Sequence, residues 1–129
     1  MKFDSIEGGK IREDRWSWHT FERESDGTQL EVKLFKPTAA ERLRLLSRYK
    51  ITADKAKWGP YITYIAQKWW SEFKSDPMPR DHVGAEIENT PVNRALMLNS
   101  DEELLSFVQE IFLRGAKELD EGNDASAFD

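Results

Sequence analysis

One stretch decides the fold: Leu30-Glu-Val-Lys-Leu-Phe-Lys-Pro-Thr-Ala-Ala-Glu41, within which a strand ends and a helix begins. Apolar residues occupy every second position of its first half, namely Leu30, Val32 and Leu34. This alternation predicts a strand with one buried face. Pro37 has no N–H to donate to a sheet, so the strand ends before it. Thr38 and Glu41 have the spacing of a capping box, and we expect a helix to start immediately after Thr38.

A second strand precedes this stretch and completes a β-hairpin. Apolar and polar residues alternate over Trp16-Ser-Trp-His-Thr-Phe21, and Ser25-Asp-Gly-Thr28 separates the two strands. The Asp-Gly pair tolerates the positive φ that a tight turn requires. A hairpin of two strands is marginally stable by itself, so we expect it to pack against helices.

Along the rest of the chain, apolar residues recur at steps of three and four, which predicts amphipathic helices. The expected helices cover residues 39–49, 60–73 and 91–98, followed by a last helix that runs to about residue 119. Pro60 suits a first helical turn, and Ser100-Asp-Glu-Glu103 is a second capping box, at the start of the last helix. The predicted fold class is α+β and mostly α-helical, with an N-terminal β-hairpin packed on about three to four helices.

The expected organisation is a single helix-rich domain over residues 15–119, because 129 residues is an ordinary size for one domain. We expect a flexible N-terminal arm over residues 1–14 and a disordered acidic tail over residues 120–129. Residues 75–90 contain two prolines and no helical period, which predicts a long surface connection. No apolar run approaches the roughly 20 residues of a membrane span, and the start lacks the apolar core of a signal peptide. We therefore expect a cytoplasmic protein that does not bind a membrane.

Composition and motifs argue against several classes of function. The absence of cysteine excludes disulfides, thiol catalysis and thiolate metal sites. His19 and His82 have no second histidine at helical spacing, and the sequence contains no nucleophile or phosphate-loop motif. We therefore predict a non-enzymatic protein with no catalytic residue, cofactor or metal. A net charge of −5 repels phosphate, so we expect no nucleic-acid partner.

Two alternatives remain, and each requires particular residues to lie close together in the folded chain. A small enzyme would gather scattered polar residues into one concave pocket: His19, Asp81, His82 and Glu86. A nucleic-acid binder would use the densest basic cluster of the chain: Arg42, Arg44, Arg48 and Lys50.

The last predicted helix carries more apolar residues than one stripe requires: Leu104, Leu105, Phe107, Val108, Ile111 and Phe112. We expect a single small core to leave part of this face exposed, and exposed apolar patches mark protein interfaces. The helix predicted over residues 60–73 also has an apolar face wider than one stripe. Four residues are therefore predicted to take part in self-association or partner binding: Trp70, Phe73, Leu105 and Phe112.

Three segments carry a resemblance to a known family: Leu34-Phe-Lys-Pro-Thr38, the Trp69-Trp70 helix end and Asn99-Ser-Asp-Glu-Glu-Leu-Leu105. With the order of the predicted elements, they resemble the tail assembly chaperones of long-tailed, lambda-like bacteriophages. The likeness is to the short form that is encoded just upstream of the tape-measure protein. It covers about residues 28–125 and lies in helix caps and apolar spacing.

This resemblance implies a late, non-enzymatic protein of viral tail assembly. Such a protein binds and solubilises the tape-measure protein in the host cytoplasm, helps to recruit the tail-tube protein, and is absent from the mature virion. The resemblance also implies a homo-oligomer, with a longer, frameshifted form of the same protein as a further partner. The alternative is a monomeric protein-binding adaptor or regulator that recognises one folded partner.

Overall fold

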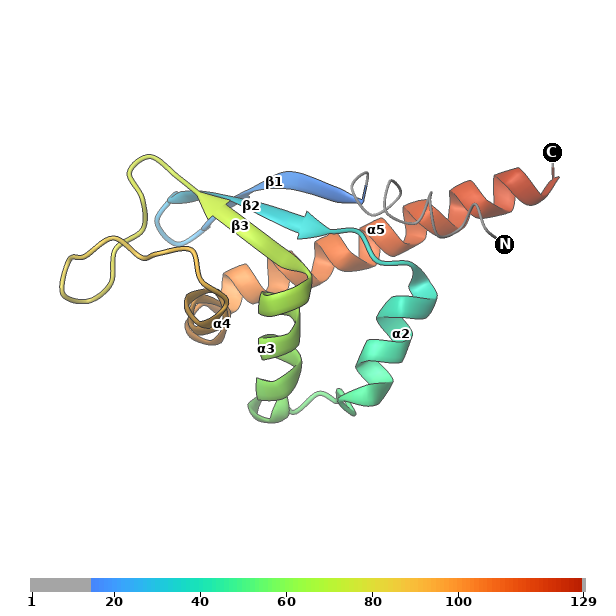
Figure 1. Ribbon diagram of the computed structural model, residues 1–129, viewed down its shortest axis with the longest axis horizontal. Helices are drawn as coiled ribbons and strands as arrows, with labels where there is room; N and C mark the ends of the chain where they lie inside the picture. Colours follow the sequence, from blue (N-terminus) through green and yellow to red (C-terminus); the bar gives the residue numbers. More distant parts are fainter. Residues whose placement is uncertain (1–14, 129) are drawn as a thin grey trace.

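The computed structural model describes the backbone of residues 15–128 and the side chains of residues 15–119. The flexible arm expected over residues 1–14 lies outside the described residues. Within them, three antiparallel strands form a sheet in the order β1-β2-β3 and pack with four α-helices, so the α+β, mostly helical class is confirmed. Figure 1 shows α5 running along the sheet, with its C-terminal part extending beyond the other elements.

The elements follow one another as β1 (Trp16–Glu22), β2 (Gln29–Phe35), α2 (Ala39–Arg48), a 3-10 helix η1 (Lys55–Lys57), α3 (Gly59–Lys68), β3 (Trp70–Lys74), α4 (Pro91–Ser100) and α5 (Glu102–Phe128). The predicted hairpin is confirmed, since β1 pairs with β2 from Trp16 opposite Phe35 to Glu22 opposite Gln29. Gly27 has the positive φ expected of its turn, 73°.

The helix predicted over residues 60–73 is wrong in its second half. It ends at Lys68, and β3 then adds a third strand to the hairpin. In the pairing of β2 with β3, Glu72 lies opposite Lys33 and Trp70 lies opposite Leu34, so Ser71 is an extra residue in a β-bulge. The bulge places Trp70 and Phe73 on the same buried face. Their spacing of three residues therefore imitates the period of a helix.

The capping box that follows the decisive stretch forms as predicted. Thr38 Oγ1 accepts a hydrogen bond from the Glu41 N–H at 3.1 Å, and Glu41 Oε1 accepts one from the Thr38 N–H at 2.8 Å. These bonds satisfy two helix-start amides, and α2 runs to Arg48, close to the predicted end.

The last helix differs from its prediction at both ends. Because α4 continues through Ser100, Asp101 takes the capping position of α5 and accepts a hydrogen bond from the Leu104 N–H at 3.1 Å. Ser100 instead donates to the Leu96 carbonyl of its own helix at 2.8 Å. The backbone of α5 runs through Phe128, beyond the predicted helix end near residue 119, and the disorder expected over residues 120–129 stays a prediction. An established helix adds one hydrogen bond for each residue, and no proline interrupts this one.

One hydrophobic core joins the sheet to the helices. Its most deeply buried members come from five elements: Val32 and Leu34 of β2, Trp70 of β3, Ile65 of α3, Leu98 of α4, and Val108 and Phe112 of α5. The face of α5 meets the sheet through Phe21 and Phe107, whose ring centroids are 5.3 Å apart. It also meets the end of α3 through Phe112 and Trp69, at 5.2 Å.

Candidate functional site

The four residues predicted to bind a partner all lie in the chain's own core. Their exposed fractions are 0% for Trp70, 4% for Phe73, 6% for Leu105 and 0% for Phe112. The expectation of an exposed apolar face is therefore wrong for these four side chains, and their part in self-association or partner binding stays a prediction. That expectation failed because β3 enlarges the sheet, while the sheet, α2 and the end of α3 cover the wide face of α5 from several sides.

The residues of the enzyme hypothesis are not gathered into one site. His19 lies on β1, where its Nε2 is 3.0 Å from Ser17 Oγ; burial lowers its pKa, and nearby Lys36 lowers it further. Asp81 lies in the exposed connection between β3 and α4, where its carboxylate accepts hydrogen bonds from two backbone N–H groups of its own turn. Glu86, in the same connection, pairs with Arg80 at 3.8 Å. Across residues 15–119, no three side chains of metal-binding type converge.

The basic cluster of the nucleic-acid hypothesis is divided by the fold. Arg44 and Arg48, four residues apart on α2, are exposed on one side of that helix. Arg42 turns inward, so that its Nε is buried, and Lys50 follows the end of the helix in a left-handed conformation with φ of 52°. Lys68, from the last turn of α3, borders the same concavity as Arg44 and Arg48, from its α3 side.

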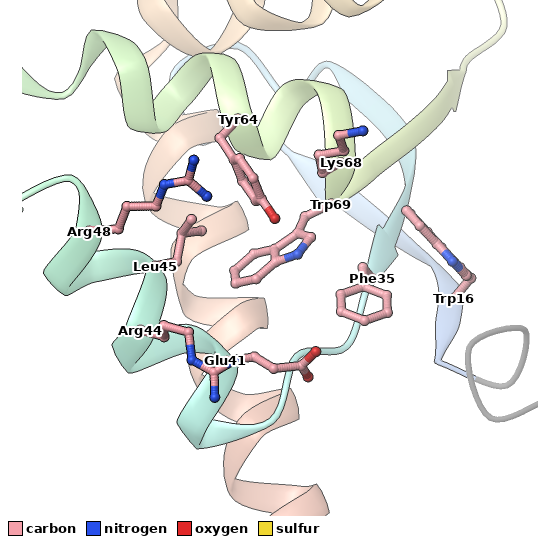
Figure 2. Close-up of a pocket in the computed structure, with 9 residues that line it drawn as sticks. All are labelled: Trp16, Phe35, Glu41, Arg44, Leu45, Arg48, Tyr64, Lys68 and Trp69. Atoms are coloured by element: carbon pink, nitrogen blue, oxygen red, sulfur yellow. The ribbon is translucent and has the colours of Figure 1, made fainter. Parts of the chain in front are cut away.

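These three cations border a concave site that we call the basic aromatic cleft. It has a volume of about 260 Å³ and is lined by Trp16, Phe35, Glu41, Arg44, Leu45, Arg48, Tyr64, Lys68 and Trp69. Figure 2 shows Trp69 at its centre, with Tyr64 and Phe35 to either side and the two arginines on the α2 side. Strands β1 and β2 and helices α2 and α3 all contribute, so the cleft exists only in the folded chain.

Aromatic rings form a continuous row along the floor of the cleft. Ring centroids are 5.4 Å apart for Trp16 and Phe35, 6.0 Å for Phe35 and Trp69, and 6.0 Å for Trp69 and Tyr64. All three distances lie in the range that favours tilted or edge-on ring contacts. Trp69 also packs on Phe112, so the floor is anchored in the core.

The carboxylate of the cleft is already engaged within the chain. Glu41 accepts the capping hydrogen bond from Thr38 and pairs with Arg15. Burial raises the pKa of Glu41, but these hydrogen bonds outweigh burial, and the net effect is a pKa below the ordinary value. Within residues 15–119, Arg44, Arg48 and Lys68 have no carboxylate within ion-pair distance. The cleft is therefore cationic although the whole chain carries a charge of −5.

Several hydrogen-bond donors of the cleft also lack an internal acceptor. Trp58 and Trp70, outside the cleft, donate their indole N–H groups to backbone carbonyls at 2.9 and 2.8 Å. In the part of the chain whose side chains are described, the indole N–H groups of Trp16 and Trp69 and the hydroxyl of Tyr64 have no such bond. The cleft thus presents donors and cations over aromatic rings, and it suits a ligand rich in acceptors.

A second and larger concavity, which we call the methionine groove, lies at the other end of the sheet. It has a volume of about 900 Å³, and the hairpin turn, the connection after β3 and the α4–α5 junction surround it. Its apolar lining includes Phe21, Leu30, Met78, Ile87, Met97 and Leu104. Arg23 and Asp101 form an ion pair at its edge.

Sequence reasoning missed both concave sites. The spacing of Arg44 and Arg48 was visible, but nothing in the sequence places Lys68, Tyr64 and Trp16 beside them. The nearest available signal was the mixture of aromatic and basic residues in the two segments that became α2 and α3.

No protein-family profile, no curated protein and no solved structure matches this chain. Among the described residues, no helix combines the length and the apolar character needed to cross a membrane.

Proposed function

We propose that this protein is a non-enzymatic tail assembly chaperone of a long-tailed bacteriophage. In this role it binds and solubilises the tape-measure protein in the host cytoplasm and helps to recruit tail-tube subunits. It acts as a homo-oligomer, together with a longer frameshifted form of itself, and leaves before the virion matures. The proposal rests on the resemblance described above and on one structural observation, the methionine groove.

The methionine groove has the properties that a chaperone for apolar segments needs. Met78 and Met97 both line this concavity. Unbranched thioether side chains adapt to differently shaped apolar partners. Ile87 and Phe21 extend the apolar lining. A groove of this kind accepts the apolar face of an amphipathic helix, and a long tape-measure protein would offer many such faces.

Apolar residues on the outer face of α4 supply a second contact surface. Val92 and Leu96 are 68% and 59% exposed and stand four residues apart, on one side of the helix. Val83, in the preceding connection, is 74% exposed. In the proposed oligomer these residues take the place of the buried residues that were predicted to mediate self-association.

The test is co-expression with the tape-measure protein of the same phage, followed by measurement of how much tape-measure protein stays soluble. Met78→Glu places a charge in the groove and is expected to reduce the soluble fraction severalfold. Leu43→Glu is the matched control, because Leu43 is 60% exposed on α2, outside the groove. Equal soluble fractions with the original chain, with the Met78 variant and without the chaperone would refute the proposal.

A monomeric protein-binding adaptor is the second candidate. The burial of Trp70, Phe73, Leu105 and Phe112 favours it, because it removes the apolar surplus from which self-association was first inferred. Light scattering coupled to size exclusion, over a concentration series, separates the two candidates. Concentration-dependent assembly supports the chaperone, whereas a strict monomer at high concentration supports the adaptor.

A further inference from the structure

We propose that the basic aromatic cleft binds an acidic peptide segment that carries an aromatic side chain and belongs to another protein. This binding site is separate from the methionine groove, and the inference does not depend on the chaperone function. It rests on the charge of the cleft, on its unpaired donors and on its size.

The charge of the cleft selects an anionic segment. Arg44 and Arg48 are exposed on α2, Lys68 borders the cleft from α3 on the other side (Figure 2), and the single carboxylate of the cleft is held by Arg15 and Thr38. Guanidinium groups bind carboxylates through paired, charge-assisted hydrogen bonds. An acidic segment therefore meets three cations at a place where the chain offers no competing carboxylate of its own among residues 15–119.

The donors of the cleft select peptide acceptors. The indole N–H groups of Trp16 and Trp69 and the Tyr64 hydroxyl have no acceptor within the described side chains, unlike the indoles of Trp58 and Trp70. Backbone carbonyls and carboxylates of an extended segment provide such acceptors. Donors that are partly withdrawn from water gain most from a fixed acceptor, because leaving a polar group unpaired is costly.

The size and lining of the cleft select one aromatic side chain. Its volume of about 260 Å³ lies below the roughly 300–1,000 Å³ that drug-sized ligands and cofactors fill. One ring inserted beside Trp69 and Tyr64 extends the aromatic row of the floor at the spacings already present in it. The flanking acidic residues then lie over Arg44, Arg48 and Lys68 at the rim.

A polynucleotide fits these features less well. Its backbone needs a continuous track of cations, because each bound phosphate contributes through the release of a counterion. Only three cations line this small cleft, and the net charge of −5 opposes a long polyanion.

The experiment follows the five tryptophan indole N–H signals of the full chain by two-dimensional NMR during titration with a synthetic peptide, Gly-Asp-Glu-Asp-Phe-Asp-Glu-Asp-Gly. We expect the signals of Trp16 and Trp69 to move, while those of Trp58 and Trp70 stay in place. Replacing the peptide's Phe by Ser, or its acids by amides, is expected to weaken binding about tenfold or more. Movement of all five signals alike, or of none at millimolar peptide, would overturn the proposal.

Matched variants decide whether the cleft itself binds the peptide. Arg44→Gln with Arg48→Gln is expected to raise the Kd about tenfold or more, since two charge-assisted contacts are lost. Arg80→Gln with Arg114→Gln removes the same charge from exposed positions outside the cleft, and we expect a change within about twofold. Equal effects of the two pairs would overturn the proposal. So would shifts of Trp16 and Trp69 with a single-stranded oligonucleotide but not with the peptide.

Discussion

Trp69 and Trp70 are neighbours in the sequence, but they belong to two regions that are built differently. Trp70 is fully buried between the sheet and the helices, and its indole N–H is bonded to the Glu72 carbonyl at 2.8 Å. Trp69 forms the floor of the basic aromatic cleft, and its indole N–H has no acceptor among residues 15–119. Trp70 thus has its polar atom paired within the chain, whereas the cleft around Trp69 leaves donors and cations for a ligand.

The contacts around the two regions show the same difference. The sheet is tied to α5 near both ends, by Arg23 with Asp101 and by Lys36 with Glu118 at 2.9 Å. Gly115 permits this close approach, because a Cβ there would lie 2.8 Å from Lys36 Cγ. Among residues 15–119, the cations of the cleft have no such ion pairs. A large aromatic residue therefore indicates a binding surface only when its polar atoms lack internal partners.

The largest effect on stability should come from removing a buried side chain between the sheet and α5. Phe112→Ala removes a fully buried ring and is expected to lower the free energy of unfolding by about 3–5 kcal/mol. Leu113→Ala is the neighbouring control, 38% exposed, with an expected loss below about 1 kcal/mol. Urea denaturation measures both. If the two losses were equal while only Phe112→Ala altered the oligomeric state, Phe112 would be an interface residue after all.

Arg94 offers the next largest effect, because it is a buried cation that joins α4 to the end of α3. It is 5% exposed, and its Nε donates to the Ala66 carbonyl at 2.8 Å, near the negative end of the α3 dipole. Burial lowers its pKa. Arg94→Ala leaves that carbonyl unpaired and is expected to cost about 2–3 kcal/mol. Thermal denaturation tests this, with the exposed Arg114→Ala as control; a loss no greater than that of the control would contradict the account.

A smaller loss is expected at the start of α5. Asp101→Ala removes both the helix cap and the partner of Arg23, at an expected cost of about 1–2 kcal/mol. Glu102→Ala, one residue later, removes only an exposed pair with Lys55, which is expected to matter by less than about 0.5 kcal/mol. Chemical denaturation should separate the two variants. Equal losses would mean that Asp101 does not cap the helix.

Glu41, which lines the cleft, should make the free energy of unfolding depend on pH. Its pKa in the folded chain lies below the ordinary value of 4.5, so its contribution is fully present above pH 4.5. That contribution is lost as the pH falls below 4.5 and through the lower folded value. Glu41→Gln should therefore flatten the dependence of stability on pH in this acidic range, with a loss at neutral pH of about 1 kcal/mol. An unchanged pH profile in the variant would show that Glu41 is not the group responsible.

The smallest effect on stability should come from the cations of the cleft. Arg44→Gln with Arg48→Gln is expected to change the free energy of unfolding by no more than about 0.5 kcal/mol, because both side chains are exposed and unpaired with any described carboxylate. The same pair of changes is expected to abolish most peptide binding. A large loss of stability would instead show that these two arginines stabilise the fold.

Local signals predicted most of the fold. Thr38 and Glu41 identified a helix start through bonds that span three residues, and Asp26-Gly27 identified the hairpin turn. The failures arose where distant segments meet. Trp70 and Phe73 have helical spacing, but the free edge of β2 offered hydrogen bonds to a strand, and a bulge reconciled that spacing with the sheet.

The candidate sites were not predictable in the same way. Arg44 and Arg48 were recognised as a basic cluster, but Lys68 and Trp16 reach the cleft only through the packing of α3 and β1. Leu105 and Phe112 were taken for a partner surface because the sequence does not show that a third strand enlarges the sheet. Burial depends on which segments meet, and the chain reveals this only once it has folded.

The sequence by itself determined the fold class, the hairpin, the Thr38 cap of α2 and the absence of thiol chemistry, because each follows from residue type or from contacts within a few positions. Only the tertiary structure decided that the widest apolar faces belong to the core and that a cationic, donor-rich cleft lies between α2 and α3. The physical reason is that burial, pairing of donors and local charge are properties of neighbours in space. For Trp69 and Trp70, adjacent in the chain, the neighbours of the two indole N–H groups differ.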